Sequence, residues 1–412
     1  MQLLLRALAV TLALSLFHRS PDLSHAEAVG PEVDYVVELL PGEGIARVSI
    51  SVSGSSLPEA LRLRIDPTRH LEFEGDGKTS MARGRLVWEV PPRGGSLRYD
   101  VRIDHDRAGP GQDAAITERW ALFRGEDLFP PMGIQTPEDV ETRANLRFEL
   151  PEQWSIVTPW SRDRESGVFE IEQEHRYFDR PTGWILAGRL GVTRETIEGV
   201  RLAIANPAGH DLHRHDILAL LRWTLDDLVE VFGKAPKRFL IVGAADPMWR
   251  GGLSGPGSLY VHAERPLIQR DGTSPILHEM FHCFMHARAG QDGDWVVEGL
   301  AEYYSLALLR RSRTISRSRY ERSLAKLKEK GAKAENLAVS RASAAVAARG
   351  AVILAALDES IRKRTDGRKS LDDIVRRLRD DREPITSEGF RTVAREVSGL
   401  DLKSFFQEHG VP

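Results

Sequence analysis

Alternation of apolar and polar positions dominates the first half of the chain. Apolar residues occupy every second position in four runs, at 48–52, 61–65, 97–103 and 146–150. Glycine and proline clusters separate these runs, which is typical of half-buried strands in an antiparallel sheet. The pattern therefore predicts a β-rich N-terminal domain over residues 29–205.

The spacing changes beyond that domain. Apolar residues recur at helical intervals over 217–232, with Asp211 as the expected N-terminal cap and Gly233 as the expected end. Short apolar runs at 239–242 and 258–261 predict two buried strands. From Ser274 onward the pattern is helical, with breaks at 290–293, 331, 365–367 and 384. We therefore predict an α+β protein whose strands precede its helices.

The N-terminus has the three zones of a secretory signal. Arg6 precedes an apolar run at 7–17, and small residues, Ala26 and Ala28, follow a polar stretch. The apolar run is shorter than the roughly 20 residues that a transmembrane helix needs, so an uncleaved anchor is the weaker alternative. We expect residues 1–28 to be a signal peptide. The mature chain would be periplasmic or extracellular and would contain no transmembrane segment.

The composition limits the kinds of binding and metal sites that the chain can contain. The 57 Lys and Arg residues against 60 Asp and Glu give a net charge of −3, so no excess of positive charge favours a nucleic-acid partner. The single cysteine, Cys283, excludes a disulfide framework within the chain and any cysteine-rich metal site. A metal site would therefore have to use some of the 13 histidines.

One histidine pair has metal-ligand spacing. His278-Glu279-Met280-Phe281-His282 lies in an apolar, helix-compatible segment. Positions i and i+4 share one face of a helix, so His278 and His282 can bind the same zinc ion. Zinc lowers the pKa of a water towards about 7, and Glu279 is placed to accept that water's proton. We predict that Glu279 is the general base.

A second helix-like segment supplies carboxylates. A catalytic zinc site uses three protein ligands and keeps one position open, and Glu298 can be the third ligand. Glu302 follows one helical turn later and can orient a ligand histidine from outside the coordination sphere. The sequence therefore predicts one Zn²⁺ per chain, held by His278, His282 and Glu298.

The two motifs, His278–His282 and 295–304, resemble those of the gluzincin metallopeptidases. Within that group the chain is most similar to the glycyl aminopeptidase family. Segments within 349–373 resemble that family's C-terminal helices, and residues 401–406 resemble its closing segment. The resemblance implies an N-terminal antiparallel β-domain, a thermolysin-like zincin catalytic domain at 206–335 and a C-terminal helical region at 336–412. It also implies the same three zinc ligands and the same base.

The chain departs from the family pattern at two places. Residues 251–255 read Gly-Gly-Leu-Ser-Gly, without the acidic residue that the family carries there. Residues 344–348 contain no tyrosine to stabilise the oxyanion. Four other residues remain candidates for oxyanion or substrate contacts: Tyr260, Tyr304, Tyr320 and His286.

The expected function is hydrolysis of peptides or proteins by an exported zinc metallopeptidase, with the strand leading to Val261 pairing with the substrate. The choice between exopeptidase and endopeptidase stays open, as does the oligomeric state. A catalytically silent zinc-bearing binding or scaffold protein is the first alternative. The second is a protein that binds anionic surfaces through residues 310–333, where ten Lys and Arg accompany two acids. A solvated helix face is the simpler interpretation of that stretch.

Overall fold

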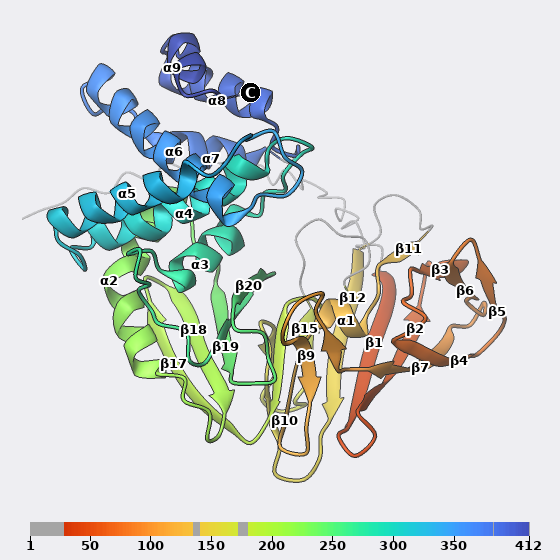
Figure 1. Ribbon diagram of the computed structural model, residues 1–412. Helices are drawn as coiled ribbons and strands as arrows, with labels where there is room; N and C mark the ends of the chain where they lie inside the picture. The colour runs from red at the N-terminus through yellow and green to blue at the C-terminus, as the bar shows by residue number, and fades with distance from the viewer. Residues whose placement is uncertain (1–28, 135–140, 172–179, 382, 412) are drawn as a thin grey trace, which may run out of the picture.

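The computed structural model describes residues 29–134, 141–171, 180–381 and 383–411 (Figure 1). The predicted signal peptide, residues 1–28, lies outside these ranges. Within them, none of the helices has the length and apolar character needed to cross a membrane.

The N-terminal half is built from β-sheets, as the alternating pattern predicts. Their orders are β14-β15-β12-β1-β2-β7-β4, β11-β3-β6-β5 and β13-β16-β10-β9-β8. The strands are β1 (Val29–Leu40), β2 (Ile45–Gly54), β3 (Ala60–Leu63), β4 (His70–Gly75), β5 (Thr79–Ala82), β6 (Arg85–Glu89), β7 (Gly95–Arg102), β8 (His105–Asp106), β9 (Gln112–Ile116), β10 (Trp120–Arg124), β11 (Met132–Ile134), β12 (Glu141–Glu149), β13 (Ser155–Val157), β14 (Ser161–Arg162), β15 (Phe169–Ile171) and β16 (Trp184–Gly188). A one-turn helix, α1 (Gly125–Leu128), follows β10.

The predicted alternation is visible in the packing. Val48, Ile50 and Val52 of β2 are fully or almost fully buried, while the residues between them are half-exposed. The pairing is not purely antiparallel, because β1 pairs with β12 in parallel. Alternation identifies a half-buried strand but does not distinguish these two directions, since both give the same side-chain period.

A five-stranded sheet of a different kind begins at Leu190. Its order is β17-β18-β19-β21-β20, from β17 (Leu190–Ile197), β18 (Val200–Pro207), β19 (Arg238–Ala244), β20 (Gly252–Gly255) and β21 (Ser258–His262). Strands β18, β19 and β21 are mutually parallel, and β17 and β20 are antiparallel edges. This mixed sheet contains both strands expected at 239–242 and 258–261. The sequence-based boundary at 205/206 falls inside β18, whereas the change of sheet occurs between Gly188 and Leu190.

Helices follow the mixed sheet. They are α2 (Arg214–Phe232), α3 (Pro275–Met285), α4 (Asp294–Arg311), α5 (Arg317–Gly331), α6 (Ala344–Arg364), α7 (Leu371–Asp380), α8 (Ser387–Ser398) and α9 (Lys403–Glu408). Gly233 ends α2 in the left-handed conformation, as expected. The expected cap, Asp211, is not the cap: α2 begins after His213, and no side chain caps it.

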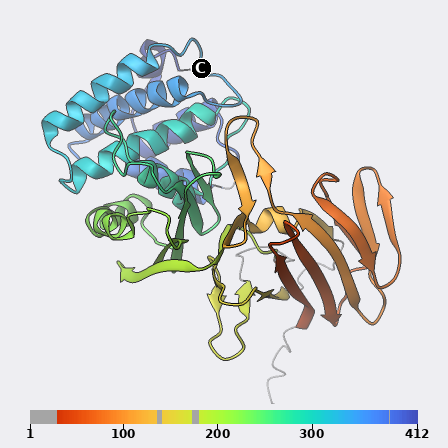
Figure 2. The same cartoon turned by 60° about the horizontal axis from the view of Figure 1, so that its bottom comes forward.

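One hydrophobic core joins the mixed sheet to all of the long helices. It extends from Val200 to Val411 and includes α2 to α9, so the segments 206–335 and 336–412 share a single interior. The opposite face of the sheet packs on β10 and β16 through Trp184, Leu240 and Tyr260. Figure 2 shows the resulting arrangement, with the helices at one end of the molecule and the N-terminal sheets at the other.

Candidate metal centre

Helix α3 carries the two histidines of the motif. The chain enters it through Ser274, whose Oγ accepts a hydrogen bond from the Leu277 amide, and Pro275 occupies the first turn. Both residues favour a helix start at this point. His286 ends the helix in the left-handed conformation, and its amide donates to the His282 carbonyl. The helix is therefore fixed at both ends around His278 and His282.

Helix α4 brings two glutamates to the same place. Glu298 and Glu302 are four residues apart and share one face of α4. Trp295, fully buried, anchors the start of the helix by donating from its indole nitrogen to the Ser387 hydroxyl at 2.9 Å. Gly299 allows α4 to pack directly against the backbone of Gly350 on α6.

Three side chains converge between α3 and α4. His278 Nε2 and His282 Nε2 are 3.2 Å apart, and the two Glu298 oxygens lie 3.4 Å and 3.5 Å from them. Zinc bonds of about 2.0–2.1 Å in tetrahedral geometry place neighbouring ligand atoms roughly 3.3 Å apart. The spacing and the donor types therefore fit a zinc ion with three protein ligands. Among the residues that the structure describes, these three form the single group with metal-ligand geometry.

A further carboxylate supports the first histidine. Glu302 Oε2 lies 3.3 Å from His278 Nδ1, which directs the Nε2 lone pair of His278 towards the cluster. Only 11% of the Glu302 side chain is exposed. Its other oxygen, Oε1, lies 3.6 Å from the Lys330 ammonium of α5.

The electrostatics of the metal-free cluster follow from this geometry. Burial disfavours the charged form of His278, but Glu298, Glu302 and Glu279 outweigh it and raise its pKa to about 10. Burial likewise opposes ionisation of Glu298, yet the two histidines hold its pKa well below its usual range. The metal-free site therefore retains a proton that a divalent cation would displace.

The predicted base lies beside an edge strand. A Cβ on Gly252 of β20 would be 3.2 Å from Glu279 Cγ and 3.3 Å from Glu279 Oε1. Cys283, one turn further along α3, donates to the carbonyls of Gly255 and Ser258. Helix α3 is thus attached to the β20–β21 hairpin, with Glu279 directed at its glycine-rich strand.

The strand expected to bind substrate has both edges occupied. β21, which contains Val261, pairs with β19 on one side and β20 on the other. The open edge belongs to β20 instead. Because His262 N donates to the Gly251 carbonyl, the alternation of an antiparallel ladder turns the backbone groups of Gly252 and Ser254 away from β21.

The four residues considered for oxyanion or substrate contacts are not part of this cluster. Tyr260 is buried and donates to the Trp249 carbonyl, and Tyr304 is buried and donates to Asp372 Oδ1. Tyr320 lies on α5, where its burial and, to a smaller extent, the carboxylates of Asp358 and Glu359 raise its pKa. His286 is exposed at the end of α3.

Two residues that contact the glutamates of the site were not identified from the sequence. Lys330 belongs to the basic stretch 310–333, which the pattern presents as a solvated face. Gly252 appeared only as part of a glycine-rich stretch. A glycine within a strand is a weak signal for a close approach by another group, here the Glu279 side chain.

Comparison with known proteins gives a match at the level of structure only. No family model and no curated protein sequence matches the chain. An aminopeptidase N family protein from Idiomarina loihiensis is similar with a TM-score of 0.68 and 15% identity, over 92% of this chain and 75% of that one. A mutant M1 zinc metallopeptidase from Deinococcus radiodurans has a TM-score of 0.58 and 16% identity, over 93% and 94% of the two chains.

These similarities establish the fold class. The chain has the mixed α+β fold of the aminopeptidase N and M1 zinc metallopeptidase structures, with N-terminal β-sheets and C-terminal helices. The expected α+β fold, with N-terminal β-sheets and C-terminal helices, is therefore confirmed.

Proposed function

We propose that the protein is an exported zinc-dependent metallopeptidase that hydrolyses peptide bonds. The observation that carries this proposal is the convergence of His278, His282 and Glu298 at the separations that tetrahedral zinc requires. Three protein ligands leave one position open, which is typical of a catalytic site. The fold similarity to zinc metallopeptidases supports the same conclusion.

The residues of the chain divide the chemistry between them. Bound zinc would act as a Lewis acid that polarises the substrate carbonyl and makes water more acidic. Glu279 would accept the proton of the attacking water and donate it to the departing amine. Glu302 would hold His278 in the tautomer that ligates through Nε2.

The edge of β20 gives the substrate a place to lie. An extended peptide can add to an open sheet edge by main-chain hydrogen bonds, and the backbone groups of Gly252 and Ser254 face that edge. Gly252 lies against Glu279, so a peptide paired with β20 would pass directly beside the base. The substrate class is therefore an extended peptide, whether free or part of a protein.

Export rests on the sequence of residues 1–28. Arg6, the apolar run 7–17 and the small residues around Ala26 and Ala28 have the order of a signal peptide. We infer cleavage after Ala26 or Ala28, giving a periplasmic or extracellular enzyme. N-terminal sequencing of the protein purified from its host would locate the cleavage.

The function is tested by cleavage of a mixed peptide library with zinc-loaded protein, analysed by mass spectrometry. Glu279→Gln is the matched blank, because it preserves the shape of the side chain and removes its basicity. We expect the variant to retain one zinc per chain and to lose about 10²–10⁴-fold in turnover. The cleavage positions would show whether chain ends or interiors are attacked. Equal cleavage by both proteins would refute Glu279 as the base.

One observation favours a second candidate function. The hydroxyls of Tyr260 and Tyr304 are bonded elsewhere, and residues 344–348 at the start of α6 include no tyrosine. If no side chain donates a hydrogen bond to the oxyanion, the protein would bind zinc and peptides without hydrolysing them. Stoichiometric zinc and saturable peptide binding, with no cleavage of any library member, would establish that alternative.

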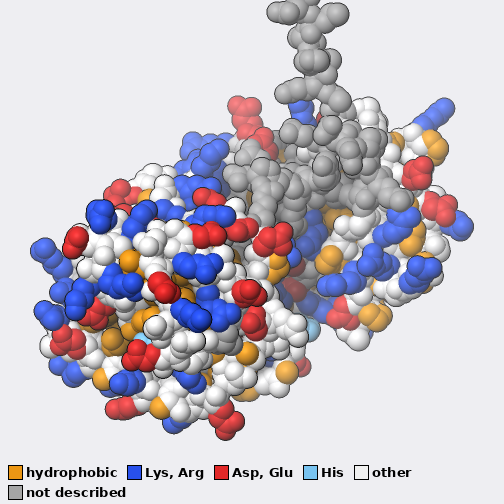
Figure 3. Space-filling view, turned by 90° about the horizontal axis from the view of Figure 1, so that it is seen from above, with side chains coloured by type: hydrophobic (Ala, Val, Ile, Leu, Met, Phe, Trp, Pro, Cys, Tyr) orange, Lys and Arg blue, Asp and Glu red, His pale blue; other side chains and the backbone are white. Residues whose placement is uncertain are grey.

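The structure gives less support to binding of anionic surfaces. Within 310–333, Arg311 pairs with Asp372 and Lys330 with Glu302, so these two cations serve internal contacts. Figure 3 shows acidic and basic side chains interspersed over the helical lobe seen from above. We therefore propose no nucleic-acid or membrane partner for this lobe.

A further inference from the structure

Three contacts attach helix α5 to the segment that leads into the zinc helix. Lys326 Nζ donates to the Arg270 carbonyl at 2.8 Å. Gly272 lies so close to Ser323 that any side chain on it would displace the Ser323 hydroxyl. Lys330 Nζ lies 3.9 Å from Asp271 Oδ2. Only Thr273 separates residues 270–272 from Ser274, the N-cap of α3, so α5 holds the segment that leads into the helix carrying both histidines.

Lys330 also reaches the second zinc-site helix. Its ammonium lies 3.6 Å from Glu302 Oε1 on α4, while Glu302 Oε2 faces His278 Nδ1. One lysine therefore links α5, the entry to α3, and the carboxylate that orients a zinc ligand.

The contact between Lys330 and Glu302 matters because Glu302 is buried. The carboxylate is almost fully buried, and a buried charge without a partner is costly. Each of its oxygens has one cationic or donor partner, His278 on one side and Lys330 on the other. Removing Lys330 would leave Oε1 unpaired and free the carboxylate to rotate away from His278.

We propose that Lys330 is a positioning residue of the zinc site, acting through Glu302 to fix the orientation of His278. This inference rests on the proposed zinc site. It assigns a role to one member of the basic stretch 310–333, and that role does not involve any external partner.

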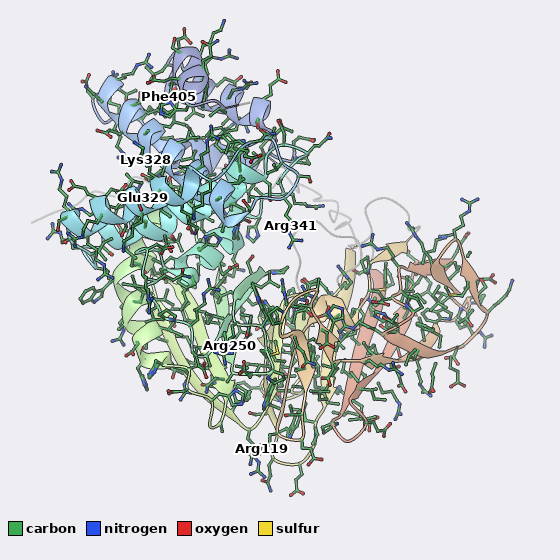
Figure 4. All side chains as sticks on the ribbon, in the orientation of Figure 1. Arg119, Arg250, Lys328, Glu329, Arg341 and Phe405 are labelled. Atoms are coloured by element: carbon green, nitrogen blue, oxygen red, sulfur yellow. The ribbon has the colours of Figure 1, made fainter. Side chains whose placement is uncertain are left out.

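The test compares zinc affinity in matched variants of the full chain. Lys330→Met removes the ammonium, Lys330→Arg keeps the charge, and Lys328→Met is the control (Figure 4). Lys328 lies on the same helix, is exposed, and makes no side-chain ion pair with any residue in the described ranges. Competition with a chelator gives the dissociation constant, and the cobalt-loaded proteins give a visible spectrum that reports ligand geometry.

Removal of an outer partner of a metal ligand costs about 10–100-fold in affinity. Lys330 contacts Glu302 and does not itself contact a proposed ligand. We therefore expect Lys330→Met to weaken zinc binding about three- to tenfold and to shift the cobalt spectrum. Lys330→Arg would restore both, and Lys328→Met would match the wild type. Equal affinities and spectra for Lys330→Met and Lys328→Met, with both folded by circular dichroism, would overturn the inference. A wild-type chain that binds no zinc would instead refute the proposed function, and the inference with it.

Discussion

Gly299 of α4 and Gly350 of α6 meet backbone to backbone. A Cβ on Gly350 would lie 3.1 Å from the Gly299 Cα and 2.6 Å from the Trp295 carbonyl oxygen. Glu298 is the immediate neighbour of Gly299, so this helix crossing fixes the position of the proposed third zinc ligand along α4. The small residues matter here because they let two helices approach at the distance the ligand geometry needs.

A methyl group at the crossing should therefore disturb both stability and the site. We expect Gly350→Ala to lower the free energy of unfolding by about 1–3 kcal/mol, because overpacking outweighs the better helix propensity of alanine. Zinc affinity should fall in the same variant as α4 moves. Urea unfolding and chelator competition measure the two effects. Gly42→Ala is the control, since a Cβ there meets nothing within 4 Å; equal losses in both variants would contradict the role of the crossing.

Gly252 gives a way to move the base without touching the metal ligands. In Gly252→Ala the new Cβ would press on Glu279 Cγ at 3.2 Å. A displacement of about 1 Å in a catalytic group costs up to 10²-fold in rate, so we expect turnover to fall about 10- to 100-fold with zinc stoichiometry unchanged. Ser254→Ala, on the same face of β20, removes an atom and should be nearly silent. Full activity in Gly252→Ala would show that Glu279 tolerates the contact.

Zinc affinity should depend on pH in a predictable direction. The pKa of His278 in the metal-free protein is about 10, so this histidine is protonated across the neutral range. Zinc must displace that proton, and its apparent affinity should rise about tenfold for each pH unit between pH 6 and 8. Chelator competition at several pH values measures the slope. Glu302→Gln, which removes one of the carboxylates that raise this pKa, should flatten the upper part of the profile.

The buried pair behind α4 should govern acid stability. Arg311 Nη2 lies 2.7 Å from Asp372 Oδ1, to which Tyr304 also donates. Burial opposes ionisation of Asp372, but these partners lower its pKa. Its contribution is therefore present above the unfolded-state pKa of about 4 and is lost as the pH falls below it.

Asp372→Asn should accordingly cost about 3 kcal/mol at pH 7. The difference from wild type should shrink in urea unfolding at pH 3, where the unfolded chain takes up the proton that the native ion pair disfavours. Asp381→Asn is the matched control, because its partner Arg377 is half-exposed and the pair contributes little. A difference that stays constant from pH 7 to pH 3 would rule out the ionised pair as its source.

Local spacing explains why the proximity of His278, His282 and Glu298 could be expected from the sequence, while their role as zinc ligands stays a prediction. His278 and His282 share a helix face at i and i+4, and Glu298 and Glu302 do so on the next helix. The prediction therefore required only that these two consecutive helices pack against each other. The strands at 239–242 and 258–261 were equally local. The resemblance to gluzincins then supplied the overall architecture.

Features set by distant pairing were not predictable. Strand order decides that β20, and not the strand containing Val261, is the open edge, and no local pattern encodes that order. The boundary at 205/206 missed the change of sheet because alternation looks the same in both sheets. Tyr304 shows the same limit, since its partner Asp372 lies 68 residues further along the chain.

The continuous interior from Val200 to Val411 has a consequence for how the molecule can be divided. A fragment ending near residue 335 would expose the apolar faces of α4 and α5 where α6 to α8 now pack. Residues 336–412 therefore complete the interior of the metal-site half and should not be removed for expression. A fragment beginning at β17 would in turn expose the face of the mixed sheet that packs on β10 and β16.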